Sequence, residues 1–418
     1  MASAAECALT FTPIESALGG LLIGFSAATM LLCYGRVLGF SGILVQSAAP
    51  LVKAGLPALW RVSVLVGLVV GGVLSGAIPS TQFPARTVDV NEGIYILAGL
   101  AIGLGASVYA NEGIELQHLR SNLGLPLTGA GPMSRQVGNG CTSGHGICGL
   151  GRLSPRSFIS VCTFMASGLV TATVTIRVVG GVDCSAVTWI AWPPKLPSHP
   201  AALVLGAFAP MVVTLALVAA ARAARGGNTP AVGAEAQRAF SLAWLLSELV
   251  PLSVGLTSGI GLVLAGMLEQ NKVRGFLNMA GQWDPSLAFV MGAGATVSLA
   301  AHQLARRWPQ PLLLDEYAYP TTCEFGADKE GRVARRCDPS LIGGSLVFGV
   351  GWGMLGICPG PSIVGLAVPL VAASQGDAWA AGAPWRFPLF FVASLLGLLV
   401  GELGVKRDRK RQVVAAMQ

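Results

Sequence analysis

Uncharged apolar stretches recur along the whole chain, separated by shorter polar segments. A helix needs about 20 residues to cross the hydrocarbon core of a bilayer. Stretches of roughly that length, or slightly shorter, predict membrane helices over Ser16–Gly35, Val62–Ala85, Gly93–Asn111, Ser157–Ile176, Ala201–Ala221, Leu249–Leu268, Pro285–Ala301 and Phe387–Gly401.

A further uncharged stretch, 339–376, contains Pro359, Gly360 and Pro361 near its middle. Proline lacks a backbone donor and clashes with the preceding helical turn. We therefore expect Pro359 and Pro361 to stop one helix and a second helix to begin near Ser362. Broken helices of this kind are typical of transporter binding sites.

The polar segments between these stretches suggest how the chain is organised. The two halves resemble each other weakly, because each has a short segment ending in Gly-Phe (Gly39-Phe40 and Gly275-Phe276) and then a glycine-rich motif with a cysteine. The predicted organisation is a first transmembrane repeat (1–221, with an insertion at 107–135), a linker (222–238), a second repeat (239–405, with a polar loop at 306–338) and a basic C-terminal tail (406–418).

Composition supports a membrane protein. Only 11% of the residues are charged, against about 25% in soluble domains. The net charge of +7 could suggest nucleic-acid binding, but the basic residues lie in short loops and in the C-terminal tail. The positive-inside rule accounts for them and predicts a cytosolic C-terminus. We expect an integral, multi-pass protein of the plasma or cytoplasmic membrane that binds no nucleic acid.

The glycine-rich segment 138–151 reads GNGCTSGHGICGLG. Glycine destabilises helix interiors, so we expect a re-entrant loop rather than a helix. Ser154 is a candidate N-cap and Pro155 a candidate first residue for the apolar helix that follows. The N–H groups of such a loop, and nearby helix N-termini, favour an anion.

Several other readings apply to Cys141, His145 and Cys148. A metal site would need a fourth ligand, and no second His/Cys cluster matches. A cysteine nucleophile with His145 as base lacks a carboxylate partner in the motif. Cys148 could also be a small residue packed between helices. Elsewhere, Trp283-Asp284-Pro285-Ser286 predicts a helix start capped by Asp284.

The strings GNGCTSGHGICGLGRLSPRSF, GMLEQNKVRGFLNMAGQWDPSLAFVMGAGA and FGVGWGMLGICPGPSIVGLA resemble the motifs of the YeeE/YedE sulfur-transport family, in the family's order. The resemblance implies an all-α polytopic membrane protein whose two inverted-topology repeats carry short re-entrant helices that form an hourglass pathway. It also implies thiosulfate uptake along pathway cysteines, here Cys141 and Cys358, with Cys148 and Cys33 as further candidates. His145 belongs to the same signature without an assigned role. The segment 107–135 departs from the family, in which the preceding helix runs almost directly into the motif.

Neutral thiols suit this substrate, because thiosulfate has a soft terminal sulfur that a thiolate would repel. The expected partners are a small inorganic sulfur anion and the lipid bilayer, with a soluble sulfur-transfer partner as a further one. No cofactor and no enzymatic reaction are expected. A carrier for a selenium compound, sulfide or sulfite is an alternative. A membrane redox enzyme that uses Cys141 and Cys148 is another, although their C-x6-C spacing is not the usual C-x-x-C.

Overall fold

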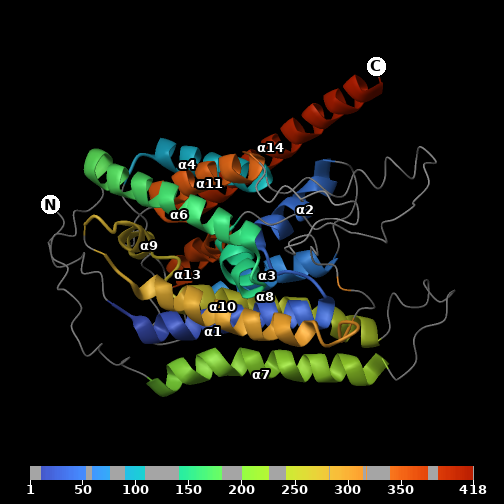
Figure 1. Ribbon diagram of the computed structural model, residues 1–418. Coiled ribbons are helices and arrows are strands. Elements are labelled where there is room, and N and C mark those ends of the chain that lie inside the picture. The colour runs from blue at the N-terminus through green and yellow to red at the C-terminus, as the bar shows by residue number, and fades with distance from the viewer. Residues whose placement is uncertain are drawn as a thin grey trace.

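The computed structural model of the chain describes residues 11–52, 59–75, 90–108, 141–180, 200–225, 242–281, 283–313, 317, 339–374 and 385–417 (Figure 1). These residues form helices and their connections, with no strand among them. The long helices are α1 (Pro13–Tyr34), α3 (Leu59–Ser75), α4 (Glu92–Val108), α6 (Pro155–Thr175), α7 (Pro200–Arg225), α8 (Leu242–Leu264), α10 (Ser286–Ala305), α11 (Pro339–Leu355) and α14 (Arg386–Met417). The short helices are α2 (Phe40–Val52), η2 (Thr142–Gly149), η3 (Ile176–Gly180), α9 (Gln270–Leu277), α12 (Pro359–Val364), η5 (Gly365–Ala367) and α13 (Val368–Ser374).

Several helices have the length and composition of membrane spans. The helices Pro13–Tyr34, Pro155–Val178 and Ser286–Ala305 are long and apolar enough to cross a bilayer, and the pair Leu341–Leu355 and Pro359–Val371, bent by 49°, would be a fourth span. Other apolar helices are shorter. Many outward side chains on the long helices are large and apolar, including Leu97, Val170, Val212 and Leu396. Such a surface suits lipid rather than water, and it confirms the expectation of a helical membrane protein.

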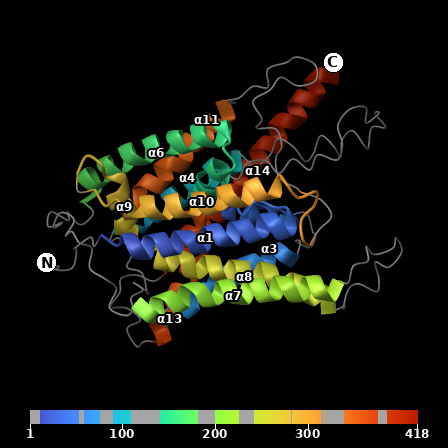
Figure 2. The same cartoon turned by 60° about the horizontal axis from the view of Figure 1, so that its bottom comes forward.

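The long helices form two layers (Figures 1 and 2). In the first layer, α3 packs along α8, α8 along α1, and α1 along α10. In the second layer, α14 packs along α4, α4 along α11, and α11 along α6. Each layer therefore contains two helices from either half of the chain. α7 lies against α8 at the edge of the first layer.

Glycines bring the helices of each layer into close contact. A Cβ atom at Gly67 would overlap the carbonyl oxygen of Leu252 on α8, and one at Gly103 would overlap that of Ser394 on α14. Between α1 and α10, a Cβ at Gly20 would lie 2.5 Å from the carbonyl oxygen of Val290. Small residues allow this approach, and van der Waals packing between close backbones holds membrane helices together.

The same contacts give the directions of neighbouring helices. Gly19 near the start of α1 faces Gly261 near the end of α8, so these two helices are antiparallel. α4 and α11 are antiparallel as well, because Gly105 faces Gly344, whereas Gly351 faces Ala98. In contrast, α3 runs parallel to α8, α10 to α1, α4 to α14, and α6 to α11.

The short helices lie between the two layers. η2 contacts α10 of the first layer and α6 of the second, while α12 contacts α3 and α8 on one side and α14 on the other. α2 and α9 also contact helices of both layers. The middle of the molecule is therefore built from short helices, with long helices on either side.

Two expectations about the short helices are wrong in detail. The glycine-rich segment is helical from Thr142, with a wide π-type turn, because its glycines pack tightly: a Cβ at Gly149 would overlap Ser157. Tertiary contacts of this kind outweigh low intrinsic helix propensity. In addition, α11 ends at Leu355, before the prolines, where Gly356 takes a positive φ of 73°. Pro359 instead begins the next helix, where its missing N–H costs nothing.

The expected start of α6 agrees with the structure, and three predicted polar segments lie mostly outside the described residues. The Ser154 side chain accepts a hydrogen bond from Ser157 N (3.4 Å), and Pro155 begins α6, so the predicted helix start is confirmed. α14 continues as a helix through the basic segment to Met417. Most of the segment 107–135, the linker 222–238 and the polar loop 306–338 lies outside the described residues.

Candidate functional site

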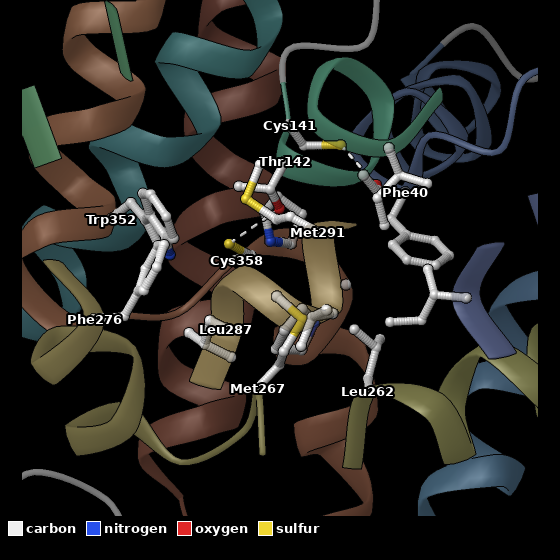
Figure 3. A pocket seen from close by; sticks show the side chains of 17 residues that line it. Phe40, Cys141, Thr142, Leu262, Met267, Phe276, Leu287, Met291, Trp352 and Cys358 are labelled. Carbon is white, nitrogen blue, oxygen red and sulfur yellow. Dashed lines mark hydrogen bonds between the residues drawn. The ribbon is translucent and has the colours of Figure 1, made fainter. Parts of the chain in front are cut away.

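A cavity lies between the two layers, bounded by the short helices (Figure 3). The centre of a water molecule has about 40 Å³ in which to move there, where a single water needs roughly 10–15 Å³. None of the lining residues is charged, and the wall is mostly apolar: Ile23, Phe40, Cys141, Thr142, Ser143, Ile147, Leu262, Met267, Phe276, Leu287, Val290, Met291, Trp352, Cys358, Pro359, Gly360 and Pro361.

Cys141 and Cys358 occupy matching positions on this wall. Cys141 is the N-cap of η2 and Cys358 is the N-cap of α12, and both have extended backbone (φ −124°, ψ 166° and φ −100°, ψ 165°). Each carbonyl oxygen accepts a hydrogen bond from the backbone N–H four residues later, at 2.9 Å. Both side chains are only 2% exposed. The two halves of the chain thus each place one thiol on the same cavity.

Hydroxyl groups hold both thiols in place. Thr142 Oγ1 donates to Cys358 Sγ at 3.5 Å, and this bond links η2 of the first half to the second half of the chain. Cys141 Sγ lies 3.1 Å from Ser143 Oγ and accepts from Gly144 N at 3.4 Å. These contacts give both thiols fixed directions within an apolar surrounding.

Aromatic and thioether side chains complete the wall. Phe40 comes from the start of α2, and Phe276 comes from the end of α9. Figure 3 shows Phe276 beside Trp352 on one side of the cavity and Phe40 on the other, with Cys358 and Met291 between them. The recurring Gly-Phe pairs in the sequence could have pointed to the two phenylalanines. Met267, Met291 and Trp352 had no comparable signal.

The remaining predicted pathway residues lie away from the cavity wall. Cys148 is buried in η2 and donates to Leu38 O at 3.6 Å. His145 is also buried, with Nδ1 2.9 Å from Ser157 Oγ on α6. Cys33 is buried in α1. The structure therefore brings Cys141 and Cys358 together and leaves the other three candidates in helix packing.

Buried charge near the middle of the molecule is mainly positive. Lys272 Nζ lies 3.2 Å from Asp284 Oδ2, and both side chains are nearly inaccessible. The Asp284 carboxylate also accepts from Ser286 N at 2.9 Å, but the N-cap of α10 is Pro285, one residue later than expected, and Asp284 instead pairs with Lys272. Arg274 is buried too, and no acceptor among the described residues lies within hydrogen-bond distance of its Nε or Nη2. Arg386, also buried, pairs at 3.6 Å with the half-exposed Glu92.

No metal site is visible in the part of the chain that the structure describes. Groups of three or more His, Cys, Asp or Glu side chains are absent there, and the described cysteines, among them Cys141 and Cys148, are free thiols.

Comparison with known proteins points to transport. Residues 246–412 match the protein family described as "Family of unknown function (DUF6691)". A protein of Xylella fastidiosa (strain 9a5c) named "Probable transporter" is 37% identical over 132 residues, which are 31% of this chain and 82% of that protein. Another "Probable transporter", from strain Temecula1 / ATCC 700964, is 36% identical over 156 residues, which are 37% of this chain and 90% of that protein. No solved structure matches.

Proposed function

The chain belongs to the same family as these probable transporters, and on this premise we propose that it carries thiosulfate, or a similar small sulfur-containing anion, across a membrane. The observation that carries the proposal is the pair Cys141 and Cys358, two buried thiols at equivalent N-cap positions on one central cavity. The resemblance of the surrounding motifs to the YeeE/YedE family supports the choice of substrate.

We further propose that the halves form two repeats of inverted topology. Helix packing supports this, because α1, α3, α4 and α6 correspond in order to α8, α10, α11 and α14. This correspondence maps the parallel pair α3–α8 onto the pair α10–α1, and the parallel pair α4–α14 onto the pair α11–α6. The pairs α10–α1 and α11–α6 are also in contact and parallel, as the correspondence requires. The self-corresponding pairs α1–α8 and α4–α11 are antiparallel, which is the relation that an axis in the membrane plane produces.

The relatives support the same division of the chain. The two Xylella proteins match over most of their own length but over only 31% and 37% of this chain. The matched family, likewise, covers only residues of the second half.

In this arrangement η2 and α12 enter from opposite sides and meet at the cavity, which makes it the narrow part of an hourglass pathway. We propose that the long helices cross the bilayer, and the basic residues after the apolar part of α14 favour a cytosolic C-terminus. The phenylalanines Phe40 and Phe276, one from each proposed repeat, lie on opposite sides of the cavity.

Charge favours an anion over a cation as the substrate. The buried charged side chains described are Lys272, Arg274 and Arg386 against Asp284. Lys272 is paired with Asp284 and Arg386 with Glu92, whereas Nε and Nη2 of Arg274 have no hydrogen-bond partner among the described residues, and no acidic side chain lines the cavity. The buried Arg274 guanidinium therefore favours an anion over a cation in its neighbourhood.

The cavity chemistry favours an anion with a soft terminal atom. Cys141, Cys358, Met267 and Met291 all line the cavity. Thiols are weak donors with a polarizable sulfur, and thioethers are polarizable without a charge. Contacts of this kind are individually weak, which suits passage, because a site that holds its ligand too tightly does not release it.

Uptake of radiolabelled thiosulfate into proteoliposomes tests this proposal. We expect saturable uptake by the wild-type protein and a loss of at least about ten-fold in Cys358→Ala and in Cys141→Ala, because each removes a contact made during passage. Cys162→Ala is the matched control, since Cys162 is exposed on α6 and absent from the cavity wall. Wild-type uptake rates in folded Cys358→Ala would contradict the proposal, and competition by selenite or sulfite instead of thiosulfate would change the substrate.

A further inference from the structure

A sulfur oxyanion that enters this cavity needs hydrogen-bond donors for its oxygen atoms. Moving a charged group from water into an apolar space is very costly unless donors replace the lost water. The wall offers few such donors: the Thr142 hydroxyl already donates to Cys358, and the thiols donate only weakly. The other hydroxyl on the wall, Ser143 Oγ, shares a hydrogen bond with Cys141 Sγ, so a further donor would strengthen binding of the anion.

Trp352 has such a donor. It lines the cavity from the last turns of α11, six residues before Cys358, and it is 2% exposed. Its Nε1 is buried, and no acceptor among the described residues lies within hydrogen-bond distance of it. Buried indole N–H groups usually have a partner. Trp352 thus holds an unused N–H at the wall of a cavity large enough for a ligand or water.

The packing of the indole fixes its direction. Its ring stands edge-on to Phe164, with centroids 5.9 Å apart and an interplanar angle of 79°. A Cβ at Gly168 of α6 would lie 3.3 Å from the Cε3 atom of Trp352. Cε3 and Nε1 are on opposite edges of an indole, so the edge nearest Gly168 is not the one that carries Nε1. Figure 3 shows this side chain on the cavity wall beside Phe276.

We propose that Trp352 is the residue that binds the oxygen end of the transported anion, through a hydrogen bond from Nε1–H to one of its oxygen atoms. The proposal rests on the function proposed above and adds an orientation to it. The sulfonate oxygens of thiosulfate lie toward Trp352, and the terminal sulfur lies among the sulfur atoms of the cysteines and of Met267 and Met291. The cavity thus recognises an anion with two chemically different ends.

Trp352→Phe is the decisive variant, because phenylalanine keeps an aromatic ring in the packing against Phe164 and removes the N–H. A hydrogen bond to a charged group contributes enough that its loss raises the KM for thiosulfate by about ten-fold or more. Trp60→Phe is the matched control. Trp60 lies on α3 between Arg36 and Arg61, each 5.0 Å from its ring, and does not line the cavity. We expect Trp60→Phe to leave the KM unchanged.

A second measurement separates recognition from folding. Thiosulfate that binds the wild-type protein raises its apparent Tm in detergent, because a ligand stabilises the state to which it binds. We expect this shift to be smaller in Trp352→Phe at the same thiosulfate concentration, with the Tm in the absence of thiosulfate within a few degrees of wild type.

The outcomes distinguish this inference from the proposed function. An unchanged KM and an unchanged thiosulfate-dependent Tm shift in Trp352→Phe, together with lost uptake in Cys358→Ala, would overturn the role of Trp352 and leave the thiosulfate transporter intact. Absence of thiosulfate uptake by the wild-type protein would overturn both. A raised KM with a reduced Tm shift in Trp352→Phe alone supports the orientation that we propose.

Discussion

At the scale of single residues, the buried pair of Lys272 and Asp284 differs from the pair of Glu92 and Arg386. Both side chains of the Lys272–Asp284 pair are nearly inaccessible, and Ser286 Oγ contacts both of them, at 3.2 Å from Lys272 Nζ and 2.6 Å from Asp284 Oδ1. The Glu92–Arg386 pair is longer, at 3.6 Å, and its carboxylate side chain is 49% exposed. The Lys272–Asp284 pair is costly to break because both side chains are buried. The Glu92–Arg386 pair costs less to break because water reaches the Glu92 carboxylate.

We expect Asp284→Asn to destabilise the protein by about 3–5 kcal/mol, because it removes the negative charge that lies 3.2 Å from the buried Lys272 ammonium. Glu92→Gln is the matched control, and a half-exposed pair of this kind contributes at most about 1 kcal/mol. Unfolding of the purified variants in detergent, followed by size-exclusion chromatography after heating, measures both. Equal losses in the two variants would mean that burial of the pair has no special effect.

Sequence reasoning identified several of these residues and missed their most important contacts. Cys141 and Cys358 were found because their motifs recur in the two halves, and Asp284 was placed at the start of a helix from its position before Pro285. The ion pair to Lys272 was missed, since the two residues lie on different elements that only the packing of α9 against α10 brings together. Trp352 was missed for a similar reason: one tryptophan in an apolar helix gives no sign of which atom faces a cavity.

At the scale of elements, close helix contacts at glycine hold the layers together. Gly20 on α1 faces Val290 on α10, and Gly255 on α8 faces Val64 on α3. These two glycines occupy corresponding places in the proposed repeats. In each case a Cβ would press on a backbone carbonyl oxygen, which cannot move aside as a side chain can.

We expect Gly20→Ala and Gly255→Ala each to destabilise the protein by about 1–3 kcal/mol, because the added methyl group separates two packed helices. Gly343→Ala on α11 is the control, since a Cβ there meets nothing within 4 Å. Alanine also favours the helix over glycine by up to about 1 kcal/mol, so this control is expected to be neutral or stabilising. The heating assay in detergent compares all three variants. Wild-type stability of Gly255→Ala would contradict the close contact between α3 and α8.

The long helices were also easier to predict than the short ones. Apolar length alone indicates where a membrane helix lies, as for α1, α6 and α10. The position of a break depends instead on local backbone geometry and on neighbours. Gly356, with its positive φ, ends α11, while Pro359 fits the first turn of α12, so the break comes earlier than the prolines suggested. The helix in the glycine-rich segment exists because Ser157 and other neighbours enclose it.

At the scale of the whole molecule, the distribution of basic residues predicts orientation. The residues Lys406, Arg407, Arg409, Lys410 and Arg411 follow the apolar part of α14. Positive charges of this kind remain on the cytosolic side of a membrane. We expect green fluorescent protein fused after Gln418 to fluoresce in cells, and a periplasmic alkaline phosphatase fused at the same place to be inactive. The reverse result would place the C-terminus on the other side and turn the proposed pathway around.

The position of α7, outside the two layers and against α8, has a consequence for how the chain is threaded through the bilayer. In the proposed repeats, α1, α3, α4 and α6 make an even number of crossings, so a second repeat joined directly would begin on the same side as the first. One additional crossing makes the number of membrane crossings before the second repeat odd. α7 supplies it, and the second repeat then starts from the opposite side, as the antiparallel pairing of α1 with α8 demands. A chain without α7 would have to insert its two halves in the same sense, and neither antiparallel pair could form.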